Sequence, residues 1–139
     1  MPGNTTLDRS RRAYFPAEWV RDNIPASQVT PAPMEIPGVS KVASLPLLDK
    51  ATLRAVVIKL SAPITSGFIR FQLTRNGSGV GPEVEMNSGT GTVFQHELQP
   101  GSLVANKGDE IGVQFGTNPS FAPDGSIEAL VLLGIEFVG

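Results

Sequence analysis

After residue 38, hydrophobic and polar residues alternate in short runs that turn residues separate. The segment 68–75, for example, places Ile69, Phe71 and Leu73 on one side and polar residues on the other. A period of two residues is typical of a strand with one buried face. The pattern predicts strands over 39–45, 52–60, 68–75, 80–86, 92–98, 110–115 and 126–138. Turns at roughly ten-residue spacing are typical of an all-β fold, here an antiparallel β-sandwich or jelly roll of about seven strands.

The first 38 residues lack this pattern and contain six of the twelve prolines. We therefore predict two parts, an extended proline-rich N-terminal arm (1–38) and a β-sandwich domain (39–139). Tyr14, Phe15 and Trp19 place three of the nine aromatic residues in the arm, and Pro16 could begin a short helix there. Such a cluster needs an apolar surface, either on another protein or on its own domain. The residues expected to contact a partner are Arg9, Arg11, Arg12, Tyr14, Phe15, Trp19, Val20 and Ile24.

Two predicted strands carry apolar residues on both faces. In 126–138, Leu130, Leu132 and Val138 share the second face with two glutamates, and 52–60 shows a similar pattern. A strand in an ordinary sandwich has one solvated face. The pattern therefore predicts that the arm, a loop of the same chain or a neighbouring subunit covers this second face, and it favours a homo-oligomer.

Composition narrows the classes of function. The chain of 139 residues has no cysteine, one histidine and a formal net charge of −2. This excludes thiol chemistry, disulfides and a multi-histidine metal site within one chain, and it disfavours a nucleic-acid-binding surface. The longest apolar run, 129–135, is too short to span a bilayer, and the first residues lack the apolar core of a signal peptide. We expect a soluble protein that is made in the cytoplasm and does not bind membranes.

The candidate catalytic groups do not combine into a site. His96 shares a strand face with Phe94 and Leu98, which indicates a core or interface histidine. Glu83 and Glu85 project from one strand face, and a solvated acidic face explains them better than a glycosidase pair. The segment 77–81 is rich in glycine, but a strand rather than a helix follows it, so we predict a hairpin loop and no phosphate site. We expect neither an enzyme nor a cofactor.

The turn chemistry of three segments, Ser61–Gly77, Gly108–Phe115 and Phe121–Gly125, resembles that of small β-sandwich proteins from the virions of tailed bacteriophages. These proteins include capsid decoration (cement) proteins, head fibres and tail components. The resemblance implies a structural protein of the virion, made in the host cytoplasm. We expect a decoration protein that binds the major capsid protein through its arm and forms a homotrimer at a symmetry axis.

Two alternatives remain. The chain could be a tail or baseplate component, in which the arm enters the tail. It could instead be a carbohydrate- or receptor-binding module that uses loops such as Ser78–Gly79 or 118–125.

Overall fold

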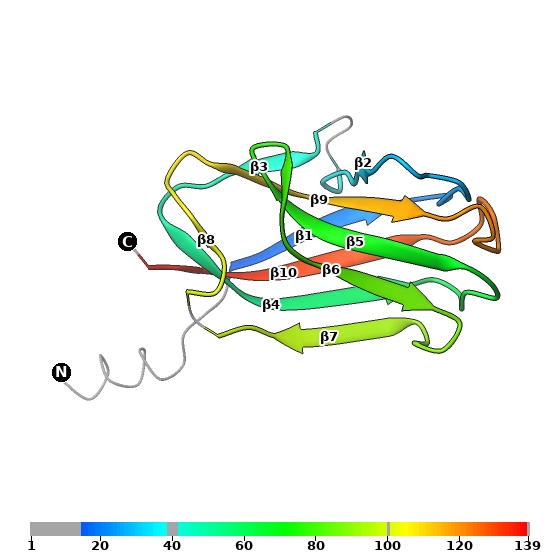
Figure 1. The fold of residues 1–139 in the computed structure, drawn as a ribbon. Coiled ribbons are helices and arrows are strands. Elements are labelled where there is room, and N and C mark those ends of the chain that lie inside the picture. Colours follow the sequence, from blue (N-terminus) through cyan, green and yellow to red (C-terminus); the bar gives the residue numbers. More distant parts are fainter. Residues whose placement is uncertain (1–14, 39–41, 100, 139) are drawn as a thin grey trace.

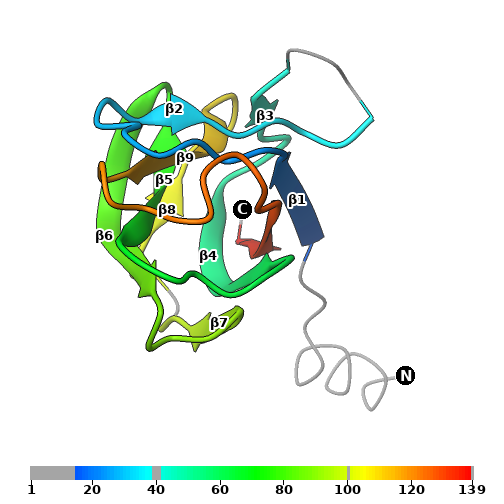
Figure 2. The ribbon, with the colours of Figure 1, turned by 90° about the vertical axis from the view of Figure 1, so that its right-hand side faces the viewer.

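Two antiparallel β-sheets pack face to face in the computed structural model, which describes residues 15–38, 42–99 and 101–138 (Figures 1 and 2). Sheet A has the order β1 (Phe15–Arg21), β10 (Ala129–Phe137), β4 (Ala51–Leu60) and β7 (Val93–Glu97), and β8 (Val104–Ala105) also pairs with β4. Sheet B has the order β2 (Ala32–Pro33), β9 (Glu110–Thr117), β5 (Phe68–Arg75) and β6 (Ser78–Asn87), and β3 (Ser44–Pro46) also pairs with β9. No described residue lies in a helix.

The strand order is that of a jelly roll. β7 and β8 pair with different parts of β4, and β2 and β3 pair with different parts of β9, so each pair acts as one interrupted strand. The described residues then form eight strands in two four-stranded sheets, and the first of these strands lies beside the last. This is the double Greek-key arrangement of jelly rolls. The predicted fold class is confirmed.

Residues 15–38 belong to the sandwich, so the predicted arm is wrong for this segment. Strand β1 pairs with β10 along its whole length, from Phe15 opposite Ile135 to Arg21 opposite Ala129. The helix expected at Pro16 is also wrong, because Pro16 lies in this strand. The remainder of the predicted arm, residues 1–14, lies outside the described residues.

The positions of the prolines explain why this segment looked like an arm. The backbone N–H of Val20 donates to the carbonyl of Glu35 (2.7 Å), so this N–H points away from β10. Residues that are two positions apart in an antiparallel strand point their backbone N–H groups to the same side of the strand. Pro16 therefore stands on the outer edge of β1, where no partner strand requires its N–H. Pro33 likewise lies in the edge strand β2.

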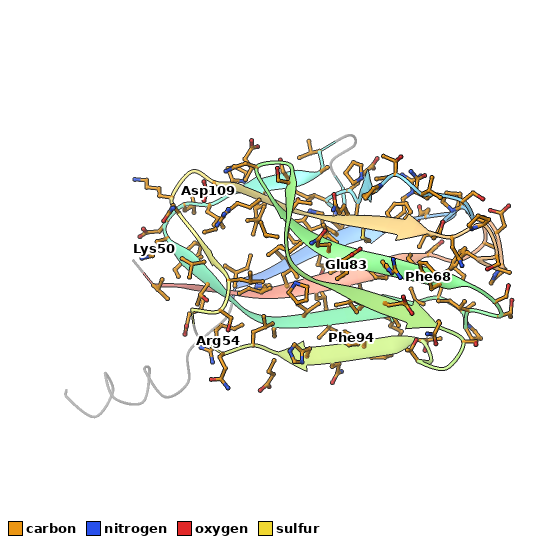
Figure 3. The ribbon with its side chains drawn as sticks, viewed as in Figure 1. Lys50, Arg54, Phe68, Glu83, Phe94 and Asp109 are labelled. Atoms are coloured by element: carbon orange, nitrogen blue, oxygen red, sulfur yellow. The ribbon has the colours of Figure 1, made fainter. Side chains whose placement is uncertain are left out.

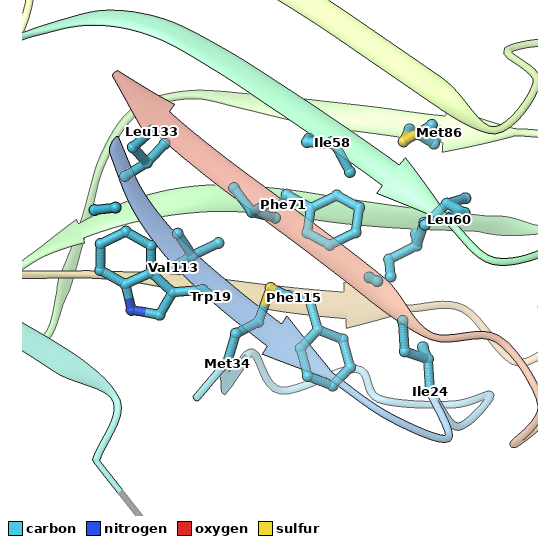
Figure 4. Close-up of a cluster of buried hydrophobic side chains, with 14 of the residues drawn as sticks. Trp19, Ile24, Met34, Ile58, Leu60, Phe71, Met86, Val113, Phe115 and Leu133 are labelled. Atoms are coloured by element: carbon cyan, nitrogen blue, oxygen red, sulfur yellow. The ribbon is translucent and has the colours of Figure 1, made fainter. Parts of the chain in front are cut away.

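The core contains inward-facing residues of both sheets (Figure 4). Ile69 and Phe71 of β5 and the three apolar residues of β9 are buried, which confirms the alternation predicted for those segments. Trp19 is fully buried in the same cluster, and its indole Nε1–H donates to the carbonyl of Ala43 (2.9 Å). The segment 15–38 thus contributes to the core.

Candidate functional site

The predicted partner-binding residues separate into three groups. Trp19 and Ile24 are 0 % exposed within the core, so their predicted contact with a partner is wrong. Val20 is half-buried on β1, and Phe15 begins that strand. Arg9, Arg11, Arg12 and Tyr14 lie outside the described residues. Among the described side chains of this set, Trp19 and Ile24 lie in the core and only Val20 keeps exposed surface, so these three do not form a binding cluster.

The groups considered for catalysis are also separate. His96 lies on β7, with its ring centroid 6.3 Å from that of Phe94, and it is exposed at the opening between β6 and β7 rather than buried in the core. In the described part of the chain, no three His, Asp or Glu side chains lie close enough together to hold a metal ion. The same residues include no helix that could cross a membrane.

The acidic strand and the glycine-rich loop have the structures predicted for them. Glu83 and Glu85 are both exposed on β6, and Glu85 pairs with Arg70 of β5 (3.1 Å). Asn76 and Gly77 both have positive φ, which forms the tight turn between β5 and β6. The segment 77–81 is thus part of a hairpin.

The outer face of sheet A has an apolar centre. The register aligns its residues in three rows across β1, β10, β4 and β7: Val20, Leu130, Lys59, Val93; Glu18, Leu132, Val57, Gln95; and Pro16, Gly134, Ala55, Glu97. Leu130, Leu132 and Val57 are half-buried in the middle of the face, and Val93 is 46 % exposed. The charged and polar residues of these rows lie around this centre and are Glu18, Lys59, Gln95 and Glu97. We call this surface the apolar face.

The arm, a loop and a neighbouring subunit were the three coverings expected for this face, and the part of the predicted arm that forms β1 does not cover it. This strand lies beside β10 in the plane of the sheet. Leu130 and Leu132 are half-buried and keep part of their surface exposed.

The outer face of sheet B is polar and is hollowed into a groove. Two adjoining depressions, of about 230 and 530 Å³, share Pro31 and Gln114. The first is lined by Arg70, Gln72 and Glu83, among others, and the second extends to Thr74, Asn76 and Glu110. We call the joined depressions the polar groove. Figure 3 labels Phe68 and Glu83, which lie on β5 and β6 at this layer.

The polar groove was not predicted from the sequence, although two of its central residues have a recognisable pattern. Gln72 occupies a polar position in a strand whose other face is buried, and Gln114 occupies the equivalent position in β9. The pairing of these strands places the two glutamines opposite each other. Alternation identifies each residue separately, but only the strand order shows that they are neighbours.

Hydrogen bonds fix one end of the polar groove. Asp109 accepts the backbone N–H of Asn106 (2.8 Å) and the side-chain amide of Asn76 (3.1 Å), and Glu110 N–H donates to Asn76 Oδ1 (2.9 Å). The hydrogen bond from Asn106 holds the pKa of Asp109 below its ordinary value of 3.8, with smaller contributions from Asn76 and Arg75. Partial desolvation opposes this shift. The ionised carboxylate of Asp109 thus ties the β5–β6 hairpin to the loop before β9.

We expect Asp109→Asn to destabilise the protein at neutral pH and to matter less in acid. Because the pKa is lower in the folded state, ionised Asp109 stabilises the fold above pH 3.8, and this stabilisation is lost as the pH falls through the folded-state pKa. Urea midpoints of the two proteins, measured from neutral pH into the acid range, should converge below pH 3.8. Glu97→Gln, in an exposed part of β7, serves as the control. A constant difference between Asp109→Asn and the unchanged protein at all pH values would contradict the role of the ionised carboxylate.

No protein-family model and no curated protein sequence matches the chain. The assignment of function therefore rests on the resemblance of the turn segments and on the surfaces described above.

Proposed function

We propose that the protein is a structural protein of a bacteriophage virion, a decoration protein that attaches to the outer surface of the capsid. Jelly rolls occur in viral capsid proteins and in lectins, so the fold is compatible with this role but does not establish it. The proposal combines the resemblance of the turn segments to virion β-sandwich proteins with the chemistry of the apolar face.

The apolar face is the observation that carries the proposal. Leu130, Leu132 and Val57 form a contiguous apolar centre, and Glu18 and Gln95 lie directly beside them on the rim. An apolar centre with a polar rim is the usual anatomy of a protein–protein interface. The attachment of a sandwich to a protein shell requires such a surface, because apolar burial supplies most of the affinity.

The proposal also assigns capsid contacts to the arginines of the first 14 residues. This segment contains Arg9, Arg11 and Arg12 and one aspartate, whereas the remaining residues contain eight basic and twelve acidic side chains. It joins the fold at Phe15, on the edge strand of sheet A. We propose that these arginines and Tyr14 contact acidic and apolar residues of the major capsid protein beside the apolar face.

Leu132→Lys is expected to weaken capsid binding at least about tenfold, since a charge in the centre of an interface must be desolvated without a partner. Because the Leu132 side chain is partly exposed, a lysine there can reach solvent in the free protein, and the variant should still fold. Ser88→Lys adds the same charge in an exposed turn and is the matched control. Binding is measured by co-sedimentation with capsids that lack the protein.

Equal decoration by Leu132→Lys and by the unchanged protein would exclude the apolar face as the attachment surface. Cryo-electron microscopy of the virion provides the wider test. Density for this jelly roll on the tail would favour the tail or baseplate role, and its absence from virions would overturn the proposal.

The homotrimer remains a prediction from the sequence. Sedimentation equilibrium of Leu132→Lys and the unchanged protein distinguishes self-association through the apolar face from association elsewhere. A trimer that dissociates in the variant would mean that this face joins the copies to each other.

A further inference from the structure

We propose that the polar groove binds a neutral carbohydrate chain. The groove follows the outward side chains of β5 from Phe68 to Thr74, a distance of about 20 Å at the usual rise per residue in a strand. It is thus long enough to hold several linked sugar rings. Its chemistry is independent of the role proposed above.

A chain of hydrogen bonds holds the two central amides of the groove in fixed orientations. Gln114 Nε2 donates to Gln72 Oε1 (3.0 Å), and Gln72 Nε2 donates to the carbonyl of Gly81 (2.9 Å). A Cβ atom at Gly79 would collide with Gln72 Oε1, so the absence of a side chain at residue 79 makes room for this amide. Within the described residues, Gln114 Oε1 accepts no hydrogen bond. This amide can therefore accept from one ligand hydroxyl and donate to a second with little loss of side-chain entropy.

A carboxylate and an apolar wall complete the lining. Glu83 lines the groove beside Arg70, and in the described part of the chain its carboxylate has neither an ion pair nor a hydrogen bond. Val29 is 74 % exposed on the opposite wall, next to Pro31. A sugar ring presents hydroxyls at its rim and C–H groups on its faces, so it matches a surface with planar polar groups and an apolar wall.

Other ligand classes fit less well. A peptide that binds by adding a strand needs a free sheet edge, but the groove lies on a sheet face, where the backbone groups are already paired. Polyanions require excess positive charge. The groove has Arg70, which Glu85 neutralises, and the additional acidic residues Glu83 and Glu110. An acyl chain would cover the Gln114 amide and the Glu83 carboxylate without offering either group a hydrogen bond. Of the ligand classes compared, a neutral, polyhydroxylated molecule therefore fits the polar groove best.

The polar groove and the apolar face lie on opposite sides of the sandwich. Sheet A and sheet B form opposite layers of the sandwich, as the view in Figure 2 shows, so their outer faces point in opposite directions. If the apolar face attaches to a capsid, which rests on the proposed function, the polar groove points away from it. A decoration protein would then present this groove to glycans on a cell surface.

The test uses the full-length ¹⁵N-labelled protein, free of capsids, and solution NMR. The probes are maltohexaose, mannohexaose and chitotetraose, with a heparin oligosaccharide and a synthetic peptide of residues 1–14 as alternative occupants. We expect at least one neutral oligosaccharide to shift the side-chain amide signals of Gln72 and Gln114 and to leave those of Gln95 on sheet A unchanged. This measurement needs no variant.

Matched variants then test the contact. Gln114→Ala should weaken binding of that oligosaccharide about tenfold, whereas Gln95→Ala should change it by less than about twofold. Gln72→Ala provides a second variant if Gln114→Ala does not fold. The proposal is overturned if no neutral oligosaccharide binds at millimolar concentration, if only heparin or the peptide binds, or if the shifts map outside the groove. Because the test involves no capsid, its failure leaves the decoration proposal standing, and equal decoration by Leu132→Lys leaves the groove proposal standing.

Discussion

A shortened chain that begins at Val39 is expected to be unfolded, without a cooperative thermal transition. It lacks strand β1 and three fully buried side chains, those of Trp19, Ile24 and Met34. Truncation of one such side chain typically costs about 2–5 kcal/mol, and a domain has only about 5–15 kcal/mol of stability in total. Loss of β1 also exposes the edge of β10, which carries Val131 and Leu133. Circular dichroism and differential scanning calorimetry measure the outcome.

The matched control is a chain that begins at Tyr14, which keeps every described strand. We expect it to fold with nearly the melting temperature of the full chain, because its described core is complete. A cooperative transition in the chain that begins at Val39 would instead support the domain boundary predicted at residue 38. The two truncations therefore decide whether the proline-rich segment is an attachment or a structural part of the sandwich.

Trp19→Ala is expected to lower the free energy of unfolding by about 3–5 kcal/mol, the usual cost of removing a buried aromatic side chain. The indole is fully buried, and its loss also leaves the carbonyl of Ala43 without this donor. Urea unfolding followed by circular dichroism measures the change. If Trp19 contacted a partner instead, the substitution would leave the stability of the isolated protein unchanged.

Trp19→Phe separates the loss of apolar surface from the loss of the N–H donor, and Leu48→Ala is an exposed control. Trp19→Phe keeps most of the apolar surface but lacks the N–H donor, so it should cost less than Trp19→Ala. Leu48→Ala removes a side chain that is 82 % exposed and should change stability by less than about 0.5 kcal/mol. If Leu48→Ala lowered the free energy of unfolding as much as Trp19→Ala, the burial of a side chain would not determine the cost of its removal.

Alternation predicted the strands that have one buried face. Ile69 and Phe71, and likewise Ile111 and Phe115, are buried as their spacing requires. The turn at Asn76–Gly77 was also predictable, since both residues tolerate positive φ. These features depend on residues close together in sequence, and the fold class follows from their number and spacing.

The role of β1 was not predictable in the same way. This strand has Pro16 in its sequence, and its partner β10 lies more than a hundred residues later in the chain. Propensity and composition do not report such a pairing. The proline is compatible with the strand only because it occupies an outer-edge position, which becomes apparent once the strand order is known. Both candidate surfaces depend on this order too, because their neighbouring residues come from distant segments.

The antiparallel pairing of β1 with β10 places the beginning of the one strand opposite the end of the other, with Phe15 facing Ile135. A peptide fused ahead of Phe15 and another fused after Val138 would therefore leave the molecule from the same pole. Two weak ligands attached in this way could engage one target together, at an effective concentration of millimolar order for short flexible linkers. The jelly roll thus provides a scaffold for bivalent display in which avidity follows from the topology.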